Sequence, residues 1–215
     1  VGSAGKKNSF NSHYSLILEE LRQEEPSFNN IAQIIETDVQ LCYRLVRVSS
    51  YQKDGEMISS ITKALIRMGL KQLERWISVL MLQDLASNKP LELTKVSLIR
   101  SRFAEFIAEN SSYRIFKSRK EEFFITGLFS LLDVILDSTM EDALEGIAFS
   151  DDILNALIHN KGAFMPVAHL IYNYELANWD KVEELANLVG IDKDLLSKGY
   201  LEAINWTNMI FNALY

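Results

Sequence analysis

The stretch that decides the fold is FFITGLFSLLDVIL, from Phe123 to Leu136. Its apolar residues form a nearly continuous run, which predicts one buried helix that begins near Lys120. Gly127 supplies a small residue at a packing turn, and Asp133 places a carboxylate among leucines. A buried carboxylate needs a hydrogen-bonding partner or a raised pKa. The stretch therefore either carries a reactive centre or forms the edge of a core helix.

The remaining segments also have helical spacing. Leu41, Leu45 and Val48 recur at three- and four-residue steps, and Gly69 stands where a helix is expected to stop. The first predicted helix is expected to turn inward Tyr14, Leu16, Ile17, Leu18 and Leu21. The expected N-caps are Asp38, Ser59 or Ser60, Thr139 and Ser150. With no convincing strand alternation and no fixed repeat, the sequence predicts an all-α domain of about a dozen mostly short helices.

Composition limits the class of protein. A chain of 215 residues with 48% hydrophobic residues can bury a large core without a covalent staple. Cys42 is the single cysteine, which excludes an internal disulfide and a cysteine-based zinc cluster. No apolar run approaches the roughly 20 residues that cross a bilayer. Residues 1–10 are typical of a linker or an expression remnant, and we expect a cytoplasmic chain.

The net charge of −7 is unevenly distributed. Residues 1–120 hold 18 Lys and Arg against 13 Asp and Glu, whereas residues 121–215 hold 4 against 16. This asymmetry favours two parts that face each other. The alternative is a nucleotide- or RNA-binding stripe in residues 100–120, with Tyr113 or Phe116 available for stacking. Its cations are Arg100, Arg102, Arg114, Lys117, Arg119 and Lys120.

The residues alone indicate no catalytic, cofactor or metal site. Glycine-rich phosphate loops are absent, and paired carboxylates such as Glu121 and Glu122 stand at helix starts, where they suit the helix dipole. His159 and His169 are ten residues apart with helix breakers between them. One continuous helix cannot therefore present both to a metal ion.

Residues 31–82 resemble the first half of the HDOD domain. That family has an acid that opens a helix, here Asp38, then an R-x-x-N-S element and an I-S-S-I-x-x-A-I helix. The second element is matched loosely by residues 47–50, one position fewer than the pattern, with Ser49 in place of the usual Asn, and the third begins at Ile58. The departure at Ser49 puts in doubt any contact made by the Asn amide.

Later segments extend the resemblance over about 190 residues. KQLERWISVLML, RSRFAEFIAE, GLFSLLDVIL, YELANWDKV and YLEAINW are similar to the HDOD subgroup found behind EAL domains, which are bacterial cyclic-di-GMP phosphodiesterase modules. The resemblance implies an HDOD domain over residues 11–215, made of an N-terminal helical subdomain (11–88) and an HD-like helical subdomain (89–215). It also implies a preceding EAL domain in a longer protein.

HDOD domains are related to HD-type metal phosphohydrolases, whose metal-binding helix reads like G-L-L-H-D-I-G. The match with GLFSLLD puts Ser130 at the His position and Leu131 at the Asp position. A hydroxyl and a leucine cannot replace these ligands, and Asp133 lies roughly 200° around a helix from the Asp site. The resemblance thus implies a non-catalytic signalling output module without a cofactor. The alternative is a degenerate phosphohydrolase that uses Asp133, His159 and His169.

Partner contacts are expected at aromatic and basic residues on turns. These candidates are Tyr51, Lys53, Trp179, Tyr200, Arg114 and Lys117. The expected partner is another protein or the EAL domain of the same chain, with a homodimer as the alternative. A nucleic-acid partner is not expected, because the global charge is negative.

Overall fold

A computed structural model describes residues 12–50, 60–147 and 149–214. These residues contain helices and turns and no strand, which confirms the all-α prediction. The chain divides into two compact units, Val1–Met81 and Leu82–Tyr215, and the division falls within α5. No helix in the described ranges is both long enough and apolar enough to cross a membrane.

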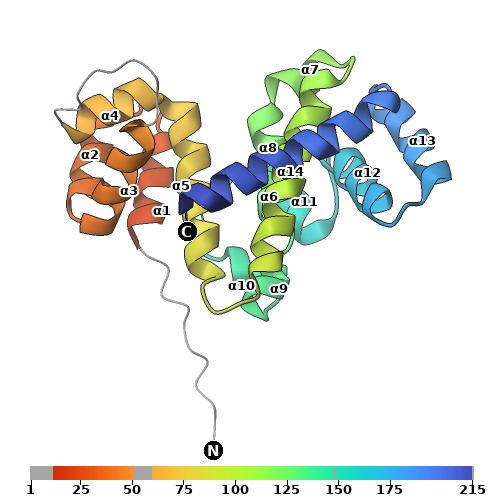
Figure 1. Ribbon diagram of the computed structural model, residues 1–215. Coiled ribbons are helices and arrows are strands. Elements are labelled where there is room, and N and C mark those ends of the chain that lie inside the picture. Colours follow the sequence, from red (N-terminus) through yellow and green to blue (C-terminus); the bar gives the residue numbers. More distant parts are fainter. Residues whose placement is uncertain (1–11, 51–59, 148, 215) are drawn as a thin grey trace, which may run out of the picture. The chain divides into compact units, whose positions relative to one another are not determined.

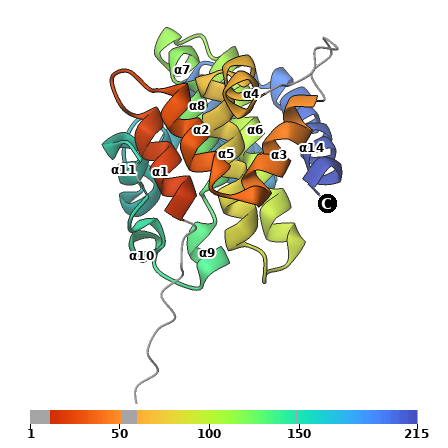
Figure 2. The same ribbon diagram turned by 90° about the vertical axis from the view of Figure 1, so that its left-hand side faces the viewer.

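The first unit is organised around α2, which packs against α1, α3 and α4 (Figure 1 and Figure 2). The buried residues of α2 are Ile31, Ala32 and Ile35. The helices of this unit are α1 (Ser12–Leu21), α2 (Phe28–Glu36), α3 (Val39–Ser50), α4 (Ile61–Met68) and most of α5 (Leu70–Leu85).

One inward residue of α1 was wrongly predicted. Ile17 and Leu18 are buried, but Leu16 is 46% exposed. Successive residues of an α-helix are about 100° apart, so three in a row cannot all face the same core. The structure resolves this conflict by turning Leu16 outward.

Two predicted caps of the first unit are confirmed. The Asp38 carboxylate accepts hydrogen bonds from the backbone N–H groups of Gln40 and Leu41, at 2.9 and 3.1 Å. The Ser60 hydroxyl accepts one from the Lys63 N–H at 3.2 Å. These contacts satisfy N–H groups that have no partner inside the helix. The α4 helix then ends at Gly69, whose φ of 76° suits a residue without Cβ.

The second unit is built around α6, which packs against α7, α8, α12 and α14. In Figure 1, α14 crosses α6, and α12 lies beside α13. Because neighbours cover most of α6, even the Glu105 side chain is buried, and it accepts a hydrogen bond from Arg102 at 2.5 Å. The helices are α6 (Leu91–Asn110), α7 (Arg114–Ser118), α8 (Lys120–Leu128), α9 (Leu132–Leu136), α10 (Met140–Leu144), α11 (Asp151–His159), α12 (Met165–Glu175), α13 (Trp179–Val189) and α14 (Asp194–Leu214).

Gly127 allows the backbones of α6 and α8 to meet. A Cβ atom at this position would lie 2.7 Å from the carbonyl oxygen of Arg100 and 2.8 Å from the Cα of Ser101. Both distances are shorter than van der Waals contact, so no side chain fits. The predicted packing role of Gly127 is confirmed, and it places α8 directly against the part of α6 that carries Arg100.

The prediction of one continuous helix over residues 123–136 is wrong. The segment forms two helices, α8 and α9, separated by a turn at Phe129, Ser130 and Leu131. In this turn the Ser130 N–H bonds to the Gly127 carbonyl, a three-residue step tighter than that of an α-helix. The Phe129 ring packs on Phe149 with centroids 5.0 Å apart. Tertiary packing thus favours a helix break at residues 129–131. No Gly or Pro at these positions indicates the break in the sequence.

Candidate functional site

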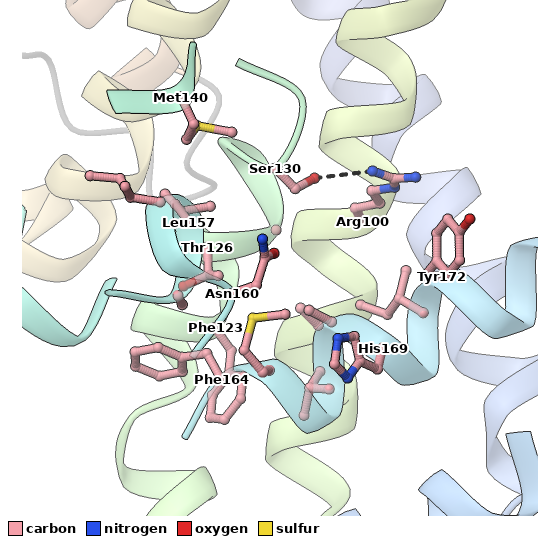
Figure 3. A pocket seen from close by; sticks show the side chains of 18 of the residues that line it. Arg100, Phe123, Thr126, Ser130, Met140, Leu157, Asn160, Phe164, His169 and Tyr172 are labelled. Carbon is pink, nitrogen blue, oxygen red and sulfur yellow. Dashed lines mark hydrogen bonds between the residues drawn. The ribbon is translucent and has the colours of Figure 1, made fainter. Parts of the chain in front are cut away.

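A pocket of about 360 Å³ opens among α6, α8, α11 and α12 (Figure 3). All residues that line it belong to the second unit. Its apolar part includes Ala104, Phe123, Phe164 and Val167. Its polar part includes Arg100, Ser130, Asp133, Asn160, His169 and Tyr172. An apolar wall with a few convergent polar groups is the usual composition of a small-molecule site.

The Arg100 guanidinium carries the positive charge at this pocket. Its Nε donates to Oε1 of Glu175 at 2.8 Å, and its Nη2 donates to Oε2 at 2.5 Å. The paired side chains are only 18% and 21% exposed. The third nitrogen, Nη1, donates to the Ser130 hydroxyl at 3.3 Å, as Figure 3 shows. Arg100 therefore joins α12 and the turn after α8 to the central helix.

The two residues at the HD positions have different surroundings. Ser130 lines the pocket and accepts the hydrogen bond from Arg100. Leu131 does not line it; this residue is the N-cap of α9, and its carbonyl accepts a hydrogen bond from the Ile135 N–H at 2.9 Å. The position aligned with a metal-binding His thus contacts a cation, and the position aligned with the metal-binding Asp belongs to a helix start.

The three residues of the degenerate phosphohydrolase alternative do not form one group. Asp133 and the exposed His169 both line the pocket, whereas the exposed His159 does not. Among the residues that the structure describes, no three His, Cys, Asp or Glu side chains gather closely enough to hold a metal ion. The donor set therefore does not match the three ligands or more that a divalent ion takes from a protein.

Most of the basic run at residues 100–120 is held in ion pairs. Arg119 pairs with Glu122 and with Asp152, at 2.7 Å each, and the hydrogen bond to Glu122 is the main cause that raises its pKa. Lys120 pairs with Glu109 at 2.6 Å, a contact that raises the pKa of the lysine. The cations Arg100 and Arg119 reach carboxylates of the acidic part beyond residue 120, as the charge asymmetry predicts.

Two cations of this run differ from the others. Arg114 and Lys117 are exposed on the short helix α7, and no ion pair is found for either of them within the described part of the chain. Two free cations provide a small phosphate-facing surface compared with the six to ten contacts of a strongly salt-dependent nucleic-acid binder. The arrangement gives little support to the RNA-binding alternative.

The other predicted contact residues fall into three groups. Tyr51 and Lys53 lie outside the described residues. Trp179 is 59% exposed at the start of α13, as an interface residue would be. Tyr200 is half-buried and packs on Phe103, with ring centroids 5.3 Å apart. Tyr200 therefore contributes to the core, although it was proposed as a contact residue.

Trp179 and Tyr200 belong to one aromatic cluster that reaches from the surface to α6. The Tyr174 ring packs against Trp179, Tyr200 and Phe103, with centroid distances of 5.6, 5.2 and 5.3 Å. Burial raises the pKa of Tyr174 and is also the main cause that raises the pKa of Tyr200. Because Glu175 follows Tyr174 directly, the cluster adjoins the Arg100 ion pair.

Sequence reasoning missed two features of this site. Glu175, which holds Arg100, lies 75 residues further along the chain, and no local signal links the two. Asn160, which lines the pocket, ends α11 with a φ of 52°. The segment IHNKG contains a partial signal for this turn, because Asn is among the few residues that adopt left-handed backbone readily.

Comparisons with known proteins place the chain in a family. Residues 8–169 match the model of the HDOD domain. The chain is 30% identical over 209 residues to the uncharacterized protein YuxH of Bacillus subtilis, covering 95% of this chain and 49% of YuxH. It is 29% identical over 196 residues to the cyclic di-GMP phosphodiesterase CdgJ of Vibrio cholerae, covering 90% and 45%.

The chain thus spans about half the length of the curated relatives it matches. No solved structure matches it. The family model covers most of the residues, including α1 to α11 and the turn that carries Ser130, and therefore the chain belongs to the HDOD domain family.

Proposed function

We propose that this HDOD domain is a regulatory module with no phosphoesterase chemistry of its own. The observation that carries the proposal is the hydrogen bond from Arg100 to Ser130 at 3.3 Å. It directs a guanidinium toward the position where an HD enzyme would place a metal-binding imidazole. A guanidinium has only hydrogen-bond donors and no lone pair for a metal ion, so it occupies this position with a group that cannot act as a ligand.

The geometry also favours a structural use for the remaining polar groups. Two of the Arg100 nitrogens, Nε and Nη2, donate to Glu175. Leu131 has an aliphatic side chain instead of a carboxylate. A general base or nucleophile next to a metal would need a different arrangement. What is left is a well-packed helical unit with an open pocket, which suits a domain that senses or transmits.

We further propose that the domain works within bacterial cyclic-di-GMP signalling, next to an EAL-type phosphodiesterase domain. The support is the likeness to a cyclic di-GMP phosphodiesterase of which this chain covers 45%. The exposed Trp179 is our candidate for the contact with that domain, because a large aromatic side chain on a surface often anchors an interface.

Metal content and hydrolysis test the first proposal. The chain is stripped with a chelator, exposed to Mn²⁺, Fe²⁺ or Zn²⁺, and analysed for bound metal and for hydrolysis of bis(p-nitrophenyl) phosphate and cyclic di-GMP. We expect neither stoichiometric metal nor turnover. The S130H/L131D variant restores only the HD pair, which is fewer than the three ligands that a divalent ion takes from a protein, so it is also expected to bind no stoichiometric metal. Stoichiometric metal with turnover in the native chain would contradict the proposal.

Kinetics of the full-length gene product test the regulatory role. We expect Trp179→Ala to change the rate of cyclic di-GMP hydrolysis by about threefold or more, as loss of a typical interface contact would. Leu188→Ala, another exposed apolar residue of α13, is the matched control and is expected to leave the rate unchanged. Equal rates for the native protein and both variants would remove the support for this contact.

A further inference from the structure

We propose that the pocket lined by Arg100 binds a small molecule with an apolar ring and an anionic group, either a carboxylate or a phosphate. The anionic group takes the place of Glu175 on the Arg100 guanidinium. This inference goes beyond the proposed regulatory function, since it names a ligand class that the domain itself would recognise. It is tested on the chain alone, so its failure would leave the absence of metal chemistry untouched.

The size and lining of the pocket fit a ligand of about ten non-hydrogen atoms. A volume of about 360 Å³ lies at the lower end of the range for small-molecule sites. Phe123 and Phe164 form an edge-to-face pair with centroids 4.8 Å apart, and they supply an aromatic wall. Such a wall accommodates a flat apolar body and offers no hydrogen-bond donor to an anion.

Polar groups also surround this opening. Figure 3 shows Arg100, Asn160, His169 and Tyr172 around it. In the described contacts Arg100 uses three of its five N–H groups, on Glu175 and Ser130. Two N–H groups remain for an incoming oxygen, and the Asn160 amide can donate a further hydrogen bond. These donors indicate a ligand with clustered acceptor oxygens.

Glu175 is a partner that an entering anion can replace on Arg100. It is the last residue of α12, where the carbonyl end of the helix dipole disfavours a negative charge. Its carboxylate is also 21% exposed, so water can replace Arg100 when the pair opens. A free anion that enters the pocket carries no such penalty. Exchange of one anion for another preserves the charge of the site.

Exchange at Arg100 would reach the surface through the aromatic cluster. Glu175 follows Tyr174, whose ring contacts the exposed Trp179 at 5.6 Å. Ala177, between the two, has a φ of 54°, which strains a residue that carries a Cβ. Release of Glu175 therefore frees the end of α12 next to a strained turn, and Trp179 reports the change.

Asp133 opposes anion binding, since its carboxylate lines the same pocket. An anion on Arg100 is repelled by this carboxylate, so removal of the Asp133 charge should strengthen binding. This dependence distinguishes a real anion site from adhesion of an aromatic ring to apolar residues, which would not respond to the charge at position 133.

Calorimetric titrations of the chain with phenyl phosphate and with benzoate test the site, and benzamide is the neutral control. We expect binding of at least one anion and none of benzamide. Arg100→Lys, which keeps the charge but loses the fork, should weaken binding by about tenfold or more. Glu175→Gln and Asp133→Asn should each strengthen it several-fold. Thermal unfolding shows that each variant is folded before it is titrated.

Two results of the titrations would overturn the inference. One is the absence of binding by both anions to folded native chain and to Glu175→Gln, which lacks the competing charge. The other is anion binding that Arg100→Lys and Asp133→Asn leave unchanged. In the W76F/W206F background, where Trp179 is the single tryptophan, a bound anion should also shift the Trp179 emission. Binding without that shift would contradict the exchange with Glu175.

Discussion

The Arg100 guanidinium meets the Glu175 carboxylate in a two-pronged contact, with Nε–Oε1 at 2.8 Å and Nη2–Oε2 at 2.5 Å. The contact joins the middle of the chain to a residue 75 positions later and ties α12 to α6. Ser130, which the resemblance aligns with a metal-binding His, lines the same pocket and accepts a hydrogen bond from Arg100. The Arg100–Glu175 ion pair therefore lies beside the residue that the resemblance aligns with a metal ligand.

The strength of this ion pair can be measured with a double-mutant cycle on Arg100→Met and Glu175→Gln. Both side chains are mostly covered, so we expect a coupling energy of about 1–2 kcal/mol, more than the median for exposed pairs. Urea denaturation gives the four stabilities. The exposed pair Lys181–Glu184, at 2.6 Å, is the control and should show a coupling of about 0.5 kcal/mol or less. Equal couplings would refute the special role of Arg100.

Gly127→Ala is expected to lower the free energy of unfolding by about 2–4 kcal/mol, because the new Cβ meets the backbone of α6. Gly199→Ala in α14 is the comparison. There the Cβ meets only side-chain atoms, the buried ring of Phe106, and a rotation of that ring can relieve the clash without displacing a helix, so the loss should be smaller. Ala is otherwise favoured over Gly in a helix, which makes a net loss at position 127 diagnostic of the contact. A stabilised Gly127→Ala variant would show that α6 and α8 can separate at no cost.

Ala177→Gly is expected to raise the free energy of unfolding by about 0.5–1 kcal/mol. Ala177 has a φ of 54°, and relief of this strain outweighs the greater freedom of glycine in the unfolded chain. Asn160→Gly is the matched control, with a φ of 52°. Because Asn tolerates this conformation better than Ala, Asn160→Gly should raise the free energy of unfolding by less than Ala177→Gly does. Thermal unfolding of the two variants measures the difference, and the reverse order would contradict the explanation by strain.

Stability at alkaline pH should depend on the aromatic cluster. Burial raises the pKa of Tyr174 and, together with Glu175, that of Tyr200. The unfolded chain loses these protons near pH 10, whereas the folded chain holds them to a higher pH. Their stabilising contribution is therefore complete below about pH 10 and is lost as the pH rises through the folded pKa values.

Urea denaturation of the native chain and of Tyr174→Phe/Tyr200→Phe from neutral to alkaline pH checks this dependence. The free energy of unfolding should fall less steeply above about pH 10 in the double variant, which has no phenol to ionise at these positions. Lys120, whose pKa is raised by Glu109, is present in both proteins and does not affect the comparison. If the free energy of unfolding fell equally steeply with pH in both proteins, burial would not raise the pKa of either tyrosine.

The local elements of the fold were predictable because their signals lie within a few residues. Asp38, Ser60 and Thr139 were expected as N-caps, and each accepts the predicted backbone hydrogen bond. Ser150 also stands at an N-cap, but its hydroxyl lies 3.4 Å from Glu122 instead of capping α11. A side chain 28 positions away decides that outcome, so the sequence around Ser150 could not indicate it.

The site was less predictable, because its geometry depends on distant contacts. The absence of the HD pair could be read directly from Ser130 and Leu131. The break after α8 could not be predicted, because it depends on the packing of Phe129 against Phe149. The partner of Arg100 could not be predicted either, because Glu175 lies 75 residues away in the chain. Tyr200 illustrates the same limit: its spacing in α14 does not reveal the two rings that cover it.

The backbone contact at Gly127 has a mechanical consequence. Side chains that separate two helices can switch rotamers and let the helices slide by small steps, but a contact between main chains leaves no such play. A displacement of α6 or α8 is therefore expected to move the other helix with it. A movement of the α6 backbone at Arg100 is therefore expected to displace α8 as well.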